Sequence, residues 1–260
     1  MAEAGEESLA LGEWPEMVRK VRARTPARLL AGRVGAAYRT ATLLELREAH
    51  AAARDAVWNE LDLQSGEAVF IKRFDPLELR TRAQGRQDYL LRPDLGRQFD
   101  ETSRAQLAAI DSRGIDLQIA IGDGLSTPAV VAQVPALLPL LEAGAGSRGW
   151  ALGRILVIHH CRVGILNEIG ELVKPQVAVL LIGERPGLAT AESLSAYLAY
   201  RPRVGHSDAD RNLISNIHAR GWSASEAAEG ILSFAAQMRK AEKSGYLLRK
   251  QMPAIKDTQP

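Results

Sequence analysis

The pattern of apolar and polar residues changes near Arg104 and divides the chain into two parts. Beyond this point, short apolar runs alternate with segments in which apolar residues recur every three or four positions. The runs are typical of strands buried on both faces, and the periodic segments are typical of helices that cover them. The pattern predicts strands at 117–121, 154–158 and 177–182, and helices at 105–113, 126–142, 165–173 and 223–243.

Short connections between alternating strands and helices predict a parallel sheet with crossover helices. The expected fold class is therefore α/β, with a Rossmann-like parallel sheet flanked by helices over residues 104–250. Ser223 and Glu226 have the spacing of a capping box at the start of the last of these helices.

The residues before Arg104 predict a helical region without a core of its own. From Thr40, which is expected to cap the helix, Leu and Ala recur at helical spacing as far as Leu61. Residues 64–100 are charged and interrupted by Pro and Gly, so only short helices are expected there. We therefore expect a helical N-terminal region at 31–103, preceded by a flexible extension at 1–30. A flexible tail is expected at 251–260.

The second half of the N-terminal extension is locally basic. Its charge comes from a series of cationic residues, Arg19, Lys20, Arg22, Arg24, Arg28 and Arg33. Such a series is typical of a solvated tail, and the alternative is an arm that lies on an acidic partner surface.

Composition narrows the class of protein. Apolar residues make up 46 % of the chain and aromatic residues 5 %, so the core must be built mainly from aliphatic side chains. The formal net charge of +2 gives no overall electrostatic reason to expect a nucleic-acid partner. A single cysteine, Cys161, cannot form an internal disulfide, which is typical of a reducing compartment.

The sequence also predicts a cytoplasmic protein. No uninterrupted apolar run approaches the roughly 18–20 residues that span a bilayer. Residues 1–8 are acidic and Ala-rich, whereas a secretory signal begins with basic residues and then becomes apolar.

The most informative strand is 177–182, because it continues directly into Gly183 and Glu184. Ligands of open α/β sheets bind beside the carboxyl ends of the strands. Glu184 is therefore a candidate ligand contact. The alternative is that Glu184 and Arg185 only form the surface of a tight turn.

Two other motifs suggest chemistry that their contexts disfavour. Residues 144–149 spell G-x-G-x-x-G, but they follow a predicted helix and precede a strand, so we interpret them as a flexible loop rather than a nucleotide site. His159, His160 and Cys161 could bind zinc, but neighbouring strand residues face opposite sides of a sheet. Cys161 is therefore expected to be a small core or crevice residue.

Several motifs occur together in the order found in one known family. They are Asp123–Ser126, Cys161–Val163, Glu168–Leu172, Gly183–Leu188 and the polar stretch Arg203–His218. With these motifs the chain resembles the small (light, or beta) subunit of ethanolamine ammonia-lyase. The likeness begins near Pro26 and fades after about Arg249, so it covers most of the chain.

The resemblance implies an adenosylcobalamin-dependent lyase that converts ethanolamine into acetaldehyde and ammonia. In this family the substrate site lies in a large, barrel-shaped subunit, and the cofactor is held between that subunit and the small one. The implied small subunit provides one wall of the cofactor site and no catalytic groups. Residues 31–103 would then dock on the large subunit within a higher hetero-oligomer. The complex would lie inside a bacterial microcompartment if the host makes one.

The resemblance also implies three cobalamin contacts, at Val163, Glu184 and Leu213. Val163 and Glu184 each follow a predicted strand, which agrees with the rule for strand ends. The sequence departs from the family pattern in two places: Cys161 replaces a Gly, and Leu213 replaces a Cys. Leu213 can keep an apolar contact but not a thiol hydrogen bond.

Two alternatives remain at the level of sequence. Residues 216–221 approach a D-x-H-x-x-G signature of other cobalamin proteins, in which a histidine binds cobalt. Asn216 cannot supply the carboxylate that would orient His218, which argues against that role. The other alternative is a Rossmann-like scaffold or nucleotide-binding module without cobalamin.

Overall fold

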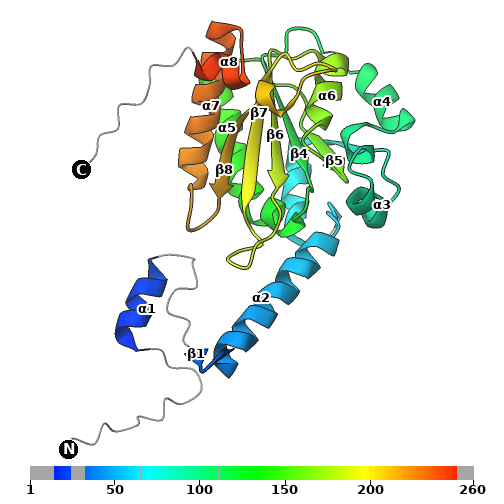
Figure 1. Cartoon of the computed structure of the whole chain (residues 1–260). Helices are drawn as coiled ribbons and strands as arrows, with labels where there is room; N and C mark the ends of the chain where they lie inside the picture. Colours follow the sequence, from blue (N-terminus) through cyan, green and yellow to red (C-terminus); the bar gives the residue numbers. More distant parts are fainter. Residues whose placement is uncertain (1–14, 25–32, 65, 111, 251–260) are drawn as a thin grey trace, which may run out of the picture.

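A six-stranded mixed sheet forms the centre of the molecule (Figure 1). The computed structural model describes residues 15–24, 33–64, 66–110 and 112–250. Across the sheet the strands are β3 (Leu77–Arg80), β5 (Leu156–His159), β4 (Leu117–Gly122), β6 (Val177–Gly183), β7 (Leu194–Tyr200) and β8 (Asn212–Ile217). The first four of these run parallel, whereas β7 is antiparallel to both β6 and β8.

Helices cover both faces of this sheet and explain its continuous apolar strands. On one face lie α5 (Thr127–Ser147) and α7 (Ala224–Ala241), and on the other lie α6 (Ile165–Val173) and α4 (Glu101–Ala108). In β6, Val179 and Leu181 pack in the core beneath α5 and α7, while Leu180 packs in the core beneath α6. A strand buried on both sides needs apolar residues at every position. The predicted α/β class is confirmed.

The predicted elements after Arg104 agree with the structure, with two corrections. The helix expected at 105–113 is α4, which spans Glu101–Ala108 and so both begins and ends earlier than predicted. Helix α6 has the predicted bounds, and the Ser223–Glu226 capping box is present at the start of α7. However, α5 continues to Ser147, so Gly144 and Gly146 are helical rather than part of a flexible loop. A Cβ on Gly144 would lie 2.2 Å from Leu232 Cδ1, so this glycine permits the close packing of α5 on α7.

Three strands of the main sheet, β3, β7 and β8, were not predicted, and neither was the N-terminal hairpin of two short strands. The short helices expected in 64–100 exist, as η1 (Gly66–Phe74), α3 (Arg86–Leu91) and η2 (Leu95–Arg97). The same segment also contains β3, which pairs with β5 and extends the main sheet. Strands β7 and β8 lie in a region that the sequence pattern left without a strand. Their polar and small residues weaken the apolar signal on which the prediction depended.

The N-terminal elements extend from the carboxyl edge of the parallel strands (Figure 1). They are α1 (Glu16–Ala23), a hairpin of β1 (Arg33–Val34) and β2 (Ala37–Tyr38), and α2 (Thr40–Trp58). Helix α2 was predicted, but its N-cap is Arg39 and not Thr40. Helix α1 lies in the segment expected to be a flexible extension, and an ion pair of 2.8 Å between Arg22 and Glu45 joins it to α2. Residues 1–14 and 25–30, and the tail at 251–260, lie outside the described residues.

Helix α5 is long and apolar enough, by length and composition, to cross a membrane, which the sequence pattern did not indicate. Its position explains this composition, because α5 packs against both the sheet and the neighbouring helix α7. Val130, Val134, Leu137 and Leu141 are among its fully buried residues. These are properties of the core helix of a globular domain.

Gly170 is predicted to be essential for the packing of α6, and Gly146 is the matched control. A Cβ on Gly170 would lie 1.7 Å from the Pro202 carbonyl oxygen, whereas a Cβ on Gly146 would meet nothing within 4 Å. Gly170→Ala should lower the free energy of unfolding by about 1–3 kcal/mol through overpacking. Gly146→Ala should raise it by up to about 1 kcal/mol. Urea unfolding would measure both, and a neutral Gly170→Ala would contradict this packing.

Candidate functional site

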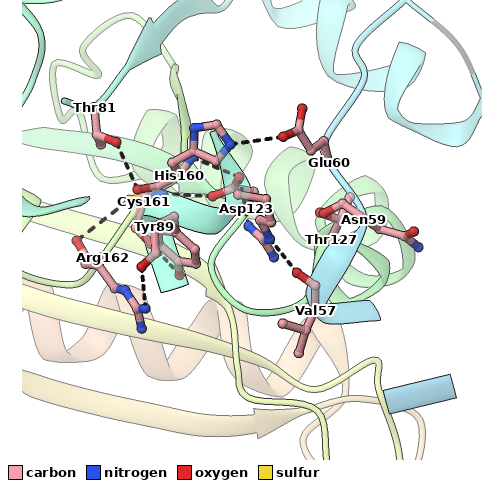
Figure 2. Close-up of polar contacts among 11 residues, drawn as sticks. Val57, Asn59, Glu60, Thr81, Tyr89, Asp123, Thr127, His160, Cys161 and Arg162 are labelled. Carbon is pink, nitrogen blue, oxygen red and sulfur yellow. Dashed lines mark hydrogen bonds and ion pairs between the residues drawn. The ribbon is translucent and has the colours of Figure 1, made fainter. Parts of the chain in front are cut away.

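A buried carboxylate joins the carboxyl ends of β4 and β5 (Figure 2). Asp123 directly follows β4, and its two oxygens accept hydrogen bonds of 2.9 Å each from the backbone N–H groups of His160 and Cys161. The Arg86 guanidinium lies 3.4 Å from the same carboxylate, and both side chains are almost fully buried. These contacts fix the turn that leads from β5 to Val163.

The same cluster holds the end of α2. The Arg86 guanidinium donates a hydrogen bond to the Val57 carbonyl, and the Thr127 hydroxyl donates one of 2.9 Å to the Asn59 carbonyl. The His160 Nε2 atom lies 3.2 Å from the Glu60 carboxylate. In Figure 2 these contacts converge on one point of the sheet edge. The protruding helix is therefore anchored to the residues that shape the β5 turn.

Cys161 is a buried core residue, as expected from the sequence. Its side chain is fully buried in the core beneath α6, and burial raises the pKa of its thiol well above the usual value. Burial likewise raises the pKa of Tyr89, whose hydroxyl donates a hydrogen bond of 3.1 Å to the Cys161 carbonyl. A protonated thiol is a poor nucleophile, so the cysteine contributes packing.

A cleft of about 590 Å³ lies on the α6 face of the sheet. One wall is the turn after β5 with the start of α6, which includes Val163 and Asn167. The opposite wall is the segment between β7 and β8, which includes His206 and Arg211. Tyr197 of β7 also lines the cleft. The volume is within the range typical of small-molecule sites, about 300–1,000 Å³.

The three residues predicted as cofactor contacts gather around Tyr197. Val163 lines the cleft and is half-buried. The Glu184 carboxylate lies 3.2 Å from the Tyr197 hydroxyl. Leu213 is the direct partner of Tyr197 in the β7–β8 ladder, so both side chains lie on the same face of the sheet. Glu184 and Leu213 thus flank the cleft rather than line it.

Tyr197 is a central residue of this site that the sequence did not reveal. Burial and the negative charge of Glu184 raise the pKa of Tyr197 to about 12. The phenol therefore stays protonated at neutral pH and donates its hydrogen bond to the Glu184 carboxylate. Recognition of β7 as a strand next to β6 would have placed this tyrosine beside Glu184.

The other candidate motifs have internal partners. His159 Nε2 lies 2.7 Å from a Glu78 carboxylate oxygen, and the His218 Nδ1 atom accepts a hydrogen bond of 3.2 Å from the Arg220 backbone N–H. Within the described ranges, no group of three or more His, Cys, Asp or Glu side chains is arranged to hold a metal ion. The cleft beside Tyr197 is therefore the best-supported site.

The geometry defines an α/β domain with a ligand-sized cleft beside its parallel strands. The chain belongs to the ethanolamine ammonia-lyase light chain (EutC) family, whose model matches residues 15–249. It is 43 % identical over 234 residues to the ethanolamine ammonia-lyase small subunit of Xanthomonas campestris pv. campestris, covering 88 % of this chain and 81 % of that one. It is also 40 % identical over 230 residues to the corresponding subunit of Clostridium perfringens, covering 88 % and 76 % of the two chains.

Asp123→Asn is expected to destabilise the protein strongly. The amide of Asn has only one acceptor oxygen, so it cannot replace both carboxylate oxygens that accept the two backbone N–H bonds. It also leaves Arg86 without its buried counter-charge. Breaking a buried ion pair costs about 3–5 kcal/mol. Asp94→Asn is the control, because the Arg92–Asp94 pair is exposed and screened by solvent and should therefore contribute little to stability. Equal losses of unfolding free energy in the two variants would contradict the role given to Asp123.

Tyr197→Phe is expected to change how stability depends on alkaline pH. Tyrosine titrates near about pH 10 in an unfolded chain, whereas the pKa of folded Tyr197 is about 12. Its contribution to stability is therefore complete below the unfolded pKa and is lost as the pH rises from the unfolded toward the folded value. The variant should lose unfolding free energy less steeply over this range. Urea unfolding at several pH values tests this, with Tyr246→Phe at an exposed tyrosine as control; identical slopes for all three proteins would refute it.

Proposed function

We propose that this chain is the small subunit of an adenosylcobalamin-dependent ethanolamine ammonia-lyase. The complete enzyme would convert ethanolamine into acetaldehyde and ammonia, and this chain would hold the cofactor against a large catalytic subunit. The observation that carries the proposal is the grouping of Val163, Glu184 and Leu213 around Tyr197, in a chain of this family.

The chemistry of the cleft fits a corrinoid. The cofactor has an apolar ring edge, many carboxamide side chains and ribose hydroxyls. Val163 and Leu213 offer apolar contacts, while the Glu184 carboxylate can accept hydrogen bonds from amides or hydroxyls. The buried Arg162 Nε and His206 Nδ1 atoms lack a hydrogen-bond partner within the described residues, and both side chains line the cleft. Unpartnered buried polar atoms indicate a surface that a polar ligand completes.

In this proposal the chain binds and orients the cofactor, and none of its side chains takes part in the reaction. Bound adenosylcobalamin would supply the cleavable cobalt–carbon bond with which the radical chemistry begins. The Tyr197 hydroxyl holds the Glu184 carboxylate in place, so that it can receive cofactor donors without rearranging. The large subunit would complete the enclosure of the cofactor and exclude water.

The N-terminal elements support a large-subunit partner. Of the residues of α2, only Thr42 and Ala56 are buried, while Leu44 and Trp58 are more than half exposed. Exposed apolar side chains also occur on α1 and the β1–β2 hairpin, at Met17, Val34 and Tyr38. Apolar surface of this kind marks protein–protein contacts. We propose that residues 31–103 dock through α2, and that α1 contributes the arm suggested by its basic residues.

We also propose a cytoplasmic location, inside a bacterial microcompartment where the host makes one. The support is the single cysteine, which is buried and protonated and therefore suited to a reducing compartment.

The direct test mixes the purified chain with its large subunit and adenosylcobalamin. The expected result is a complex that retains corrinoid absorbance after desalting and forms acetaldehyde from ethanolamine. A stable complex that retains no corrinoid and has no activity would favour the alternative, a scaffold that lacks cobalamin.

Glu184→Ala should weaken cofactor retention without affecting assembly. The variant loses a charged hydrogen-bond acceptor next to Tyr197, which corresponds to a loss of affinity of about tenfold or more. Glu192→Ala is the control, because Glu192 is an exposed carboxylate of the same connection between β6 and β7. Gel filtration would report assembly, and equilibrium dialysis would report affinity. Unchanged corrinoid affinity in Glu184→Ala would remove Glu184 from the site.

A further inference from the structure

The charges that line the cleft do not cancel. Three arginines line it, Arg97, Arg162 and Arg211, together with two carboxylates, Glu168 and Asp208. Asp208 forms an ion pair with Arg211, and Glu168 forms one with Arg104, which does not line the cleft. The positive charges of Arg97 and Arg162 are therefore left without an acidic partner in the cleft.

Several contacts fix the position of Arg162, one of these two arginines of the cleft. Its backbone N–H donates a hydrogen bond of 2.8 Å to the Gly96 carbonyl, and its guanidinium donates one of 2.9 Å to the Tyr89 carbonyl. The guanidinium also lies over the Tyr89 ring, 4.1 Å from its centroid. A Cβ on Gly96 would lie 2.6 Å from Arg162 Cγ, so Arg162 can pack this closely against η2 only because residue 96 is glycine.

Arg97 is the last residue of η2, and its side chain packs against the start of α6. Its aliphatic part crosses Gly164, where an added Cβ would lie 2.9 Å from Arg97 Cγ. Within the described residues the guanidinium forms no hydrogen bond or ion pair. The hydrogen bond from Arg92 lowers the pKa of the Asp94 carboxyl, and the charge of Arg97 adds to this effect, but that carboxylate is paired with Arg92. Gly164 is the N-cap of the nine-residue helix α6 and lines the cleft, so the positive end of the helix dipole adds to the positive charge of the cleft.

We propose that Arg97, supported by Arg162 and the start of α6, binds the phosphodiester group of the cofactor's nucleotide loop. This inference rests on the proposed function. Among the groups of adenosylcobalamin, the phosphodiester is the anion outside the corrin ring, and arginine is the side chain best suited to bind phosphate in a fixed orientation. Val163, between Arg162 and Gly164, would contact the apolar part of the same ligand.

The test compares three corrinoids on the assembled complex of this chain and its large subunit. Adenosylcobalamin and adenosylcobinamide phosphate carry a phosphate group, whereas adenosylcobinamide does not. Binding would be measured by equilibrium dialysis with wild type, Arg97→Gln, Arg97→Lys and Arg92→Gln. Arg92 is the control because it is an exposed arginine of the same segment that pairs with Asp94 and does not line the cleft.

Arg97→Gln should weaken the binding of both phosphate-bearing corrinoids by about tenfold or more and leave adenosylcobinamide unchanged. Arg97→Lys should retain part of the affinity, and Arg92→Gln should retain all of it. An equal loss for all three corrinoids, or no loss, would overturn the inference. The proposed function would still stand as long as the wild-type complex binds adenosylcobalamin. If wild type binds none of the three, the proposed function itself fails.

Gly164→Ala provides a second variant that keeps every charge. The added methyl group should displace the aliphatic part of Arg97, so the affinity for phosphate-bearing corrinoids should fall more than that for adenosylcobinamide. Equal effects on all three ligands would contradict the position given to Arg97.

Discussion

The carboxylate of Asp123 is the contact on which the arrangement of the site depends. It holds the backbone of His160 and Cys161, and its partner Arg86 holds the end of α2. A buried carboxylate is stable only when it is paired and hydrogen-bonded, and both oxygens of Asp123 accept a backbone N–H bond beside the Arg86 guanidinium. The turn that carries Val163 and the helix proposed to meet the large subunit are therefore fixed to one point. Partner docking and cofactor binding would share this support.

The antiparallel strands give the domain its particular cleft. A purely parallel sheet would end at β6, and Glu184 would then lie at an open edge. Strand β7 instead places Tyr197 beside Glu184, and β8 places Leu213 opposite Tyr197. The connection between β7 and β8 returns to α6 and forms one wall of the cleft. Because residue 170 of α6 is glycine, Pro202 of this connection can pack closely against the helix.

The sequence predicted those elements whose apolar pattern is strong. Strand β6 and helix α6 were found almost residue for residue, because their apolar residues are continuous or strictly periodic. Strand β3 was missed because two of its four residues are charged and alternate with its two leucines. Strands β7 and β8 were missed because Ser, Asn and Tyr interrupt their apolar residues. Glu184 was a candidate from its position after a strand, whereas Val163 and Leu213 were implied by the family resemblance. Tyr197, Arg86 and Arg97 could not be predicted, because their roles arise only from tertiary contacts.

The most direct test is an experimental structure of the chain with its large subunit and adenosylcobalamin. The corrinoid is expected to lie between the subunits and to contact Val163, Glu184 and Leu213 around Tyr197. A corrinoid bound elsewhere, with this cleft filled by side chains of the large subunit, would contradict this expectation.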